Sequence, residues 1–397
     1  MTNSPALADL RVLDFTRLLP GPFCTCVLAD LGADVVKIED PLGGDYLRRM
    51  PPVVKETGAN FLAVNRNKRS VVLDLRHEAG RETLLRLMDR FDVAVEGFRP
   101  GVMDRLGVGY AALRARQPRL IFASLSGYGQ DGPYRERAGH DVNYCALAGG
   151  AGLTGNRDGR LAIPGHQPAD LSAALYAAMS ILAAVVRRKR TGEGCFIDIS
   201  LTDCARALNV LQFQEYLQSN YVPGPADHIF SGRYVCYNLY RTKDGRHMSL
   251  GALEPKFWLE FCRAVGKTHL ETDGFALADE GAPVKRELDE MFAARTQAEW
   301  IEFFARFDCC CEPVLRLDEA AAHPLARQRG VIREAVHPTE GPLRQLTQPM
   351  RFDPPAEGEQ RPAPALGQHN REVLSEAGMS EDEIIALQQR GAFGSAR

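Results

Sequence analysis

A histidine and two aspartates stand in an otherwise apolar part of the sequence. His140 and Asp141 are adjacent in the segment AGHDVNY, and Asp170 lies 30 residues after His140, at the start of the run DLSAALYAAMS. Imidazole and a partly desolvated carboxylate can both be tuned toward neutral pH, so such a pair could transfer protons to and from one small substrate. The spacing alone leaves a second interpretation open, in which His140 is an interior histidine and Asp170 is the N-cap of a helix.

Strands and helices alternate through the first half of the sequence. This alternation predicts βαβ units and a parallel sheet. The turn LLPGPFC after the first strand lacks the pattern Gly-x-Gly-x-x-Gly, and the sequence has no Gly-x4-Gly-Lys-Ser/Thr. Binding of a nicotinamide dinucleotide and nucleotide hydrolysis are therefore not expected. The predicted strands are residues 11–16, 33–39, 69–75 and 93–98.

The second half of the sequence no longer shows the regular alternation of strands and helices. Residues 170–190 predict one long helix that is apolar nearly all round and therefore buried. Further on, YVCYNLYRTKDGRHMSLGAL predicts an antiparallel hairpin with its turn at 243–245, followed by helices. After about residue 325 the chain is rich in proline, and an irregular path over another part of the surface is expected. A last helix begins at Ser380, where Glu383 completes a capping box.

The composition excludes several classes of protein. The 397 residues carry a formal net charge of −3, which argues against general affinity for nucleic acid or anionic membranes. No run approaches eighteen apolar residues and no signal peptide pattern is present, so a cytoplasmic protein is expected. The ten cysteines include CTC and CCC but no Cys-x-x-Cys pair, so we expect reduced thiols and no metal.

Several blocks of sequence, in order from about residue 8 to 320, resemble the family III CoA-transferase superfamily of the CaiB/BaiF type. This superfamily contains formyl-CoA and carnitine CoA-transferases and the α-methylacyl-CoA racemases, and the racemase branch is the closer one. The blocks are LRVLDFTRLLPGPFCTCVLADLGADVVKIEDP, NRNKRSVVLDLR, EGFRPGVMDRLG, SGYGQDGPY and RRKRTGEGCFIDISLTD.

The resemblance implies an α/β fold with two parts. A Rossmann-like large domain with a parallel sheet would contain residues 1–222, and a smaller α+β domain would contain residues 223–325. The segment 326–397 would return to the large domain. The resemblance also implies an interlocked homodimer, in which each chain is threaded through the ring of the other.

The implied ligand is an acyl-CoA thioester. CoA is then part of the substrate, and neither a cofactor nor a metal is expected. The positions that match CoA-binding residues are Arg76, Arg99 and Arg105, and guanidinium groups bind phosphates through two parallel hydrogen bonds. Asp40 stands where some racemases have a basic residue, so the phosphate contacts are expected to differ in detail.

The resemblance also assigns catalytic roles. In the transferases, the carboxylate at Asp170 attacks the thioester and forms a mixed anhydride, and then an enzyme thioester. In the racemases, the same carboxylate and the histidine of a Gly-His-Asp motif, here His140 followed by Asp141, act as acid and base on opposite faces of the α-carbon. Glu254 of the neighbouring subunit would support the histidine. The apolar surroundings would receive the acyl chain, and the N–H dipoles at the helix start are expected to keep Asp170 ionised.

The sequence favours one branch without excluding the other. No run of consecutive glycines follows residue 200, unlike in the transferases, which favours a 2-methylacyl-CoA racemase. Against this, DHIFSGRY lacks the Gly-Gly pair of the racemases, and the segment 43–70 has a length more typical of the transferases. A family III CoA-transferase therefore remains the alternative. A CoA-ester-binding protein without turnover is disfavoured, because all four expected catalytic residues are present.

Overall fold

The computed structural model describes residues 5–358 and 360–394, and within it the chain divides into two compact units. The large unit consists of Met1–Ala148, His166–Leu208 and Leu325–Arg397. The small unit consists of Gly149–Gly165 and Asn209–Pro324. The small unit thus combines two segments that are separated in sequence by His166–Leu208 of the large unit.

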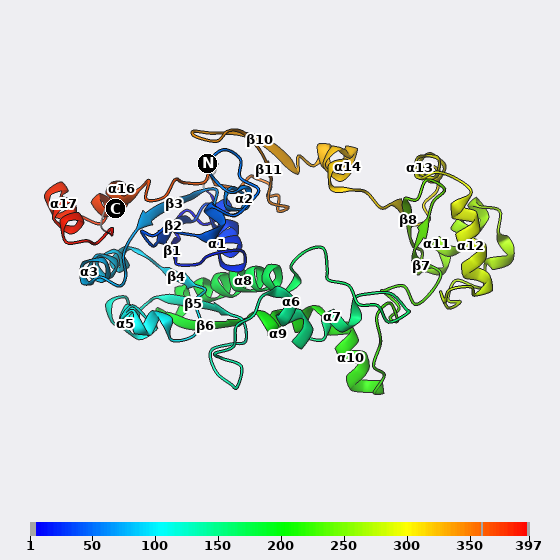
Figure 1. Cartoon of the computed structure of the whole chain (residues 1–397), viewed down its shortest axis with the longest axis horizontal. Helices are drawn as coiled ribbons and strands as arrows, with labels where there is room; N and C mark the ends of the chain where they lie inside the picture. The colour runs from blue at the N-terminus through cyan, green and yellow to red at the C-terminus, as the bar shows by residue number, and fades with distance from the viewer. Residues whose placement is uncertain (1–4, 359, 395–397) are drawn as a thin grey trace. The chain divides into compact units, whose positions relative to one another are not determined.

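The large unit is built on one six-stranded parallel sheet (Figure 1). The strand order is β3-β2-β1-β4-β5-β6, which confirms the predicted parallel α/β architecture. The order reverses direction between β1 and β4, and this is where open α/β sheets bind ligands, beyond the carboxyl ends of the strands. The strands are β1 (Arg11–Asp14), β2 (Asp34–Glu39), β3 (Lys68–Val72), β4 (Val93–Glu96), β5 (Ile121–Ser126) and β6 (Cys195–Ser200).

Helices cover both faces of this sheet. On one face, α1 and α8 pack against each other. On the other face, one hydrophobic core joins α3 and α5 to α16 and α17 near the C-terminus. The helices of this unit include α1 (Pro20–Asp30), α2 (Ala59–Val64), α3 (Glu78–Leu87), α4 (Val102–Arg105), α5 (Tyr110–Arg116), α6 (Asp141–Leu147), α8 (Pro168–Thr191), α9 (Leu201–Leu208), α16 (Asn370–Glu376) and α17 (Glu381–Gln389), with short 3-10 helices η1 (Tyr46–Arg48) and η2 (Met88–Arg90).

Helix α8 is only partly buried, so the prediction of burial nearly all round is wrong. Its alanine-rich face packs against α1, α6, α9 and the sheet. Its other face leaves large apolar side chains exposed, namely Leu175, Tyr176, Met179 and Val186. The helix is long and apolar enough to span a membrane, contrary to the expectation from the lengths of the apolar runs. Its packing against α1, α6, α9 and the sheet identifies it as a core helix with one uncovered face.

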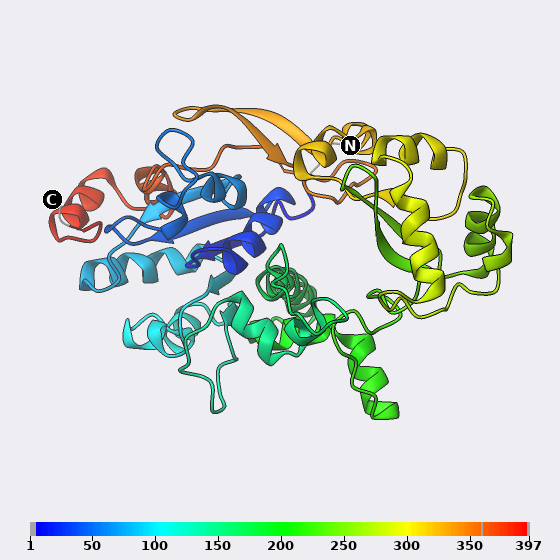
Figure 2. The ribbon, with the colours of Figure 1, turned by 45° about the vertical axis from the view of Figure 1, so that its right-hand side comes forward.

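The segment predicted to be irregular after residue 325 contains an antiparallel hairpin. Strand β10 (Ile332–His337) pairs with β11 (Gly341–Leu346), and Gly341 takes a positive φ of 80° at the turn. The prediction failed because prolines mask the alternating patterns IREAVH and PLRQL. Figure 2 shows this hairpin, in orange, beside the blue N-terminal part of the large unit. Gln345 donates a hydrogen bond from Nε2 to the carbonyl of Leu62 (3.2 Å), which ties the hairpin to α2.

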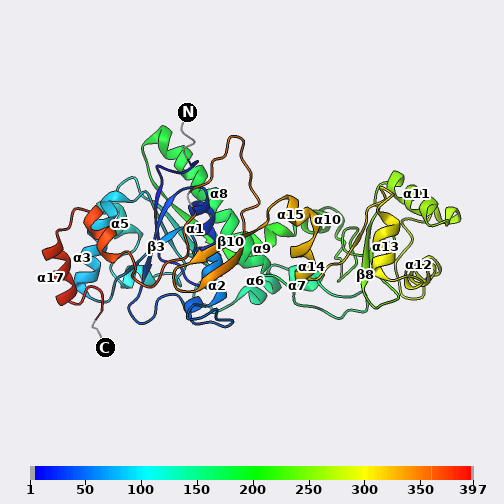
Figure 3. The same ribbon diagram turned by 90° about the horizontal axis from the view of Figure 1, so that it is seen from above.

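The chain then returns to the sheet through α16 and α17. Helix α16 contacts β3, and α17 lies beside α3 (Figure 3). The predicted capping box at the start of α17 is confirmed, because Ser380 Oγ accepts a hydrogen bond from the Glu383 amide. The long C-terminal segment therefore completes the core of the unit that begins at the N-terminus.

The small unit is an α+β unit whose predicted hairpin is confirmed. Strand β7 (Tyr237–Arg241) pairs antiparallel with β8 (His247–Gly251), and β9 (Cys311–Pro313) adds to β8. Stacked aromatic side chains fill its core; they include Tyr240, Phe261, Phe292, Trp300 and Phe304. Its helices include α7 (Gly150–Leu153), α10 (Val210–Ser219), α11 (Pro255–Ala264), η3 (Thr268–Leu270), α12 (Pro283–Ala293), α13 (Gln297–Phe304) and α14 (Leu317–Ala322), and α15 (Pro324–Gln328) follows at the boundary between the two units.

Candidate active site

Two acidic residues mark the point where the strand order reverses. Asp14 is the last residue of β1 and Glu96 is the last residue of β4, and both are buried. The loops that follow these strands run along the carboxyl edge of the sheet. Helices that follow parallel strands begin at the same edge, so the first turns of α1 and α8 also lie there. This edge therefore positions all the candidate residues of the large unit.

Buried charges hold the loop after β1. The Asp14 carboxylate accepts hydrogen bonds from Thr16 N (2.9 Å) and from Lys68 Nζ (2.9 Å). Lys37 Nζ donates to the carbonyl of Thr16 (2.7 Å) and pairs with Asp45 (3.1 Å). The two ammonium groups hold the pKa of Asp14 well below its usual range, against the opposing effect of burial. The loop is thus fixed from beneath by charges that reach no solvent.

Asp141 caps helix α8, and Asp170 does not. One oxygen of Asp141, Oδ1, accepts hydrogen bonds from the backbone amides of Ala169 (2.8 Å) and Asp170 (3.0 Å). Asp170 is the third residue of α8, which starts at Pro168. The N-cap interpretation of Asp170 is therefore wrong: a neighbouring segment supplies the cap, and the Asp170 side chain remains available for another role.

The Asp170 carboxyl is tuned toward neutrality. Burial, and then the negative charge of Asp141, raise the pKa of Asp170 to about 7. This corrects the expectation that helix dipoles keep Asp170 ionised, because the amides of this first turn already point at Asp141 rather than at Asp170. A carboxyl with this pKa is present in both protonation states at neutral pH, as an acid/base catalyst requires.

His140 stands beside these carboxylates at the start of α6. It is exposed, and its backbone amide donates to Asn143 Oδ1 (3.0 Å). The preceding Gly139 carbonyl accepts a hydrogen bond from Tyr144 Oη (2.5 Å). A Cβ on Gly139 would lie 2.6 Å from Tyr128 Oη, so only glycine fits there. The glycine and the two tyrosines together fix the backbone that carries His140.

The predicted CoA-binding arginines are all exposed, and their surroundings differ. Arg99 lies close enough to Tyr144 that its charge acts on the phenol, whose pKa burial raises to about 12. A Cβ added to Gly101 would lie within 3.4 Å of both Arg105 Nη1 and Arg135 Nη2, so these two guanidinium groups flank the same turn. Arg76 instead bonds Asp74 through Nε (2.9 Å).

Glu254 belongs to the small unit. It is exposed and occupies the N-cap position of α11. The structure therefore brings His140, Asp141 and Asp170 together in the large unit, and it places Glu254 in the other unit of the same chain.

Sequence reasoning missed a buried carboxyl beside the site. Glu96 Oε2 accepts a hydrogen bond from Phe98 N (2.7 Å), and its other oxygen meets the hydroxyl of Ser124. Gln130 Nε2 donates to the same Ser124 Oγ (2.8 Å), so Glu96 links the loops after β4 and β5. Burial raises the pKa of Glu96 to about 7. The only signal in the sequence was a glutamate at the end of the apolar strand VAVE.

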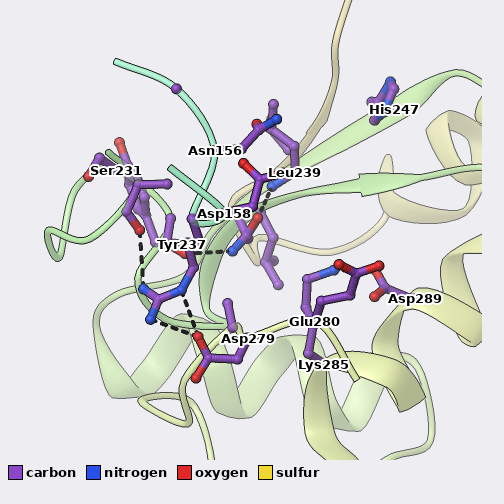
Figure 4. Close-up of a pocket in the computed structure, with 18 of the residues that line it drawn as sticks. Asn156, Asp158, Ser231, Tyr237, Leu239, His247, Asp279, Glu280, Lys285 and Asp289 are labelled. Atoms are coloured by element: carbon purple, nitrogen blue, oxygen red, sulfur yellow. Dashed lines mark hydrogen bonds and ion pairs between the residues drawn. The ribbon is translucent and has the colours of Figure 1, made fainter. Parts of the chain in front are cut away.

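A cavity of about 1120 Å³ within the small unit does not contain the predicted residues (Figure 4). Its charged side chains already neutralise one another. Arg157 pairs with Asp227 (3.1 Å) and with Asp279 (2.7 Å), and Lys285 pairs with Asp289. Within the part of the chain that the structure describes, no group of three or more His, Cys, Asp or Glu side chains could hold a metal ion, and the cysteines are unpaired thiols.

Comparison with known proteins agrees with this architecture. A family model described as CoA-transferase family III matches residues 7–370. The chain is 34% identical over 383 residues to the α-methylacyl-CoA racemase of Homo sapiens, with 96% of each chain covered. It is 31% identical over 396 residues to the succinyl-CoA:glutarate CoA-transferase of Homo sapiens, covering 97% of this chain and 89% of that one. A crystal structure of a CaiB/BaiF family protein from Brucella suis matches with a TM-score of 0.82 and 30% identity, covering 95% of this chain and 100% of the other.

The fold, the tuned carboxyl and these likenesses define an α/β enzyme of the superfamily that contains CoA racemases and CoA-transferases. The chain belongs to CoA-transferase family III, as its sequence resemblance indicated.

Proposed function

We propose that this enzyme is a 2-methylacyl-CoA racemase that works through two acid/base groups. The observation that carries the proposal is the Asp170 carboxyl with a pKa of about 7, in the first turn of α8 and hydrogen-bonded through its amide to the residue that follows His140. A racemase needs one group to remove the α-proton and a second to return a proton to the opposite face. The pKa of the Asp170 carboxyl suits this exchange at neutral pH, and histidine is the residue type that most often serves as the second acid/base.

The proposed reaction consists of two proton transfers on opposite faces of the α-carbon. Ionised Asp170 takes the α-proton and leaves an enolate of the thioester, and protonated His140 gives a proton to the other face. In the reverse direction the two groups exchange roles. Asp141 positions Asp170 through the α8 cap, and Glu254 of the second subunit would support His140. Neither a cofactor nor a metal takes part in this scheme.

The CoA moiety would be held by arginines at the carboxyl edge of the sheet. Arg99 and Arg105 follow β4, at the reversal of strand order, and neither forms an ion pair with another described residue. Guanidinium groups that are free of carboxylate partners are available for phosphate. Arg76 would have to exchange its Asp74 partner for a phosphate oxygen.

A CoA-transferase is the second candidate, and the likeness to a succinyl-CoA:glutarate CoA-transferase favours it. In that reaction the Asp170 carboxylate attacks the thioester carbonyl and the CoA thiolate leaves, so a mixed anhydride forms. Only the ionised carboxylate is a nucleophile. A pKa of about 7 leaves a large fraction of Asp170 protonated at neutral pH, which suits acid/base exchange better than nucleophilic attack.

The assembly and the location are also proposals. The uncovered apolar face of α8 supports a homodimer, because exposed apolar patches of this kind mark interaction sites. The interlocked form of that dimer follows from the family resemblance. A cytoplasmic location is proposed from the cysteines, which are all free thiols, as is usual for proteins of a reducing compartment.

The deciding experiment incubates the enzyme with a 2-methylacyl-CoA in D2O, with and without an added carboxylic acid. Mass spectrometry follows the incorporation of deuterium. We expect deuterium at the α-carbon of the 2-methylacyl-CoA even when no acceptor acid is present. His140→Ala is expected to lose epimerisation by at least about 100-fold, the usual contribution of a positioned acid/base. Asp170→Asn is expected to be inactive in both reactions, because an amide neither exchanges protons near neutral pH nor attacks a thioester.

A different result would establish the second candidate. Wild-type enzyme that shows no deuterium exchange but moves CoA to the added acid is a transferase. Hydroxylamine would then trap the acyl group or the CoA on Asp170, and His140→Ala would retain most of the transfer activity.

A further inference from the structure

An apolar cavity lies close to Asp170 in the large unit and has no part in the chemistry described so far. Its volume is about 560 Å³, within the range of small-molecule pockets. The side chains around it are mostly aliphatic and include Leu19, Phe23, Leu62, Val64, Leu171 and Leu343. These residues come from α1, α2, α8 and β11, and several of them belong to one hydrophobic cluster. The cavity is therefore part of the folded large unit rather than a gap between units.

The position of the cavity relative to Asp170 is set by the helices. Leu19 and Phe23 lie at the start of α1, and Leu171 directly follows Asp170 in the first turn of α8. Helices α1 and α8 pack side by side, and both begin at the carboxyl edge of the sheet. The apolar cavity and the reactive carboxyl thus share one edge of the sheet and one turn of α8.

One polar group inside this lining is left unsatisfied. Among the described residues, the Nε2 of Gln348 is buried and has no hydrogen-bond partner. Gln348 lines the cavity, as does the exposed guanidinium of Arg344. A buried amide donor without an acceptor costs free energy, so its presence points to a ligand that supplies the acceptor.

We propose that this cavity binds the acyl chain of the CoA ester, and that Gln348 selects chains whose far end carries an oxygen acceptor. The inference rests on the proposed function, since it places the thioester at Asp170. The apolar body of the chain would lie against the apolar wall formed by Leu19, Phe23 and Leu171. Its terminal oxygen would accept the Gln348 N–H. The segment directly after β11, which contains Gln348, supplies this far end and therefore acts as the specificity element.

Binding of S-alkyl-CoA thioethers tests the cavity without any turnover, because these compounds have no thioester carbonyl. With wild-type enzyme, isothermal calorimetry is expected to show affinity that rises roughly fourfold per methylene along a series from ethyl to hexyl. Ala63 is exposed on α2 and borders the cavity, so Ala63→Trp fills the space without disturbing the core. This variant is expected to lose the dependence on chain length while its affinity for free CoA stays unchanged.

The selectivity of Gln348 is tested in the same series. The ratio of affinities for S-(5-carboxypentyl)-CoA and S-hexyl-CoA is expected to fall at least tenfold in Gln348→Leu. Ala293→Trp is the matched control, because Ala293 is also an exposed helix alanine but lies on α12 of the small unit. It is expected to behave as wild type in both measurements.

The inference is overturned if Ala63→Trp keeps the dependence on chain length, or if Gln348→Leu leaves the affinity ratio unchanged. Failure of the proposed function gives a different result. In that case no α-proton exchange is found with any 2-methylacyl-CoA, while the thioether affinities still follow chain length and still respond to Ala63→Trp.

Discussion

The residue with two separable effects on the site is Asp141. Its Oδ1 accepts two amide hydrogen bonds at the start of α8, and its negative charge raises the pKa of Asp170. Asparagine keeps a carbonyl oxygen at the same position but carries no charge. The substitution Asp141→Asn therefore isolates the electrostatic effect from the structural one.

The first prediction concerns the pH dependence of this variant. In the direction in which Asp170 removes the α-proton, the rate should rise with pH as Asp170 ionises, with an apparent pKa near 7. Asp141→Asn removes the neighbouring negative charge, so the rising limb should move to lower pH. It should remain above the usual aspartate value, because burial is the larger cause of the shift. The measurement is deuterium exchange between pH 5 and 9.

Glu136→Gln provides the control for general charge effects, since Glu136 is an exposed carboxylate in the same loop. Its rising limb should coincide with that of the wild type. A limb that does not move in Asp141→Asn would show that Asp170 does not titrate next to Asp141 in the working enzyme.

At the scale of the element, the loop after β1 depends on charges buried beneath it. Asp14 is shared by Lys68 (2.9 Å) and, at 3.9 Å, by Lys37, and none of the three side chains is exposed. Removing one partner of a buried ion pair leaves charge without compensation and is strongly destabilising. The network thus fixes the loop that leads into α1. This loop lies at the carboxyl edge of the sheet, where Asp170 is also found, and it borders the proposed acyl cavity.

The second prediction is that Asp14→Asn lowers the free energy of unfolding by about 3–5 kcal/mol at pH 7, measured by urea denaturation. The pKa of Asp14 is held below its usual value in the folded protein, so its stabilising effect is present above about pH 4 and is lost as the pH falls. The stability difference between wild type and variant should therefore shrink in acid. Asp9→Asn, at an exposed position, should leave the stability unchanged at every pH, and an equal loss in both variants would contradict this role.

At the scale of the whole molecule, the uncovered apolar face of α8 is expected to be a subunit interface. Met179 is 54% exposed and lies between Leu175 and Val186 along one face of the helix. The third prediction is that Met179→Glu shifts a dimer toward the monomer in light scattering, because a charge in an apolar interface is costly. Circular dichroism should show the wild-type helix content. A dimer that persists at low concentration in this variant would place the interface elsewhere.

The fourth prediction tests whether Glu254 works across subunits. Glu254→Ala and Asp170→Asn are each expected to be inactive or nearly so as homodimers. Coexpression of the two variant chains with different tags yields a heterodimer. If Glu254 acts in the site of the partner subunit, one of the two sites in this heterodimer contains both an intact Asp170 and an intact Glu254. This heterodimer should recover about half of the wild-type activity per dimer. Lack of recovery would show that Glu254 and Asp170 of one chain serve the same site, or that Glu254 has no catalytic part.

Local patterns were sufficient for much of the fold. Alternating short strands and helices predicted the parallel sheet, the turn at 243–245 predicted the hairpin β7–β8, and Ser380 with Glu383 predicted the start of α17. Each of these signals is contained within a few neighbouring residues. The β10–β11 hairpin was missed because the surrounding segment is rich in proline, although the alternation of its strands is present in the sequence.

The sequence by itself determined which residues could do chemistry: His140, Asp141 and Asp170 were recognisable by type, spacing and resemblance. The tertiary structure alone decided the state of Asp170. Its pKa depends on burial by segments distant in sequence and on Asp141, whose carboxylate takes the amides that would otherwise stabilise a charged Asp170. Desolvation and through-space charge are properties of the packed molecule, and no local pattern contains them.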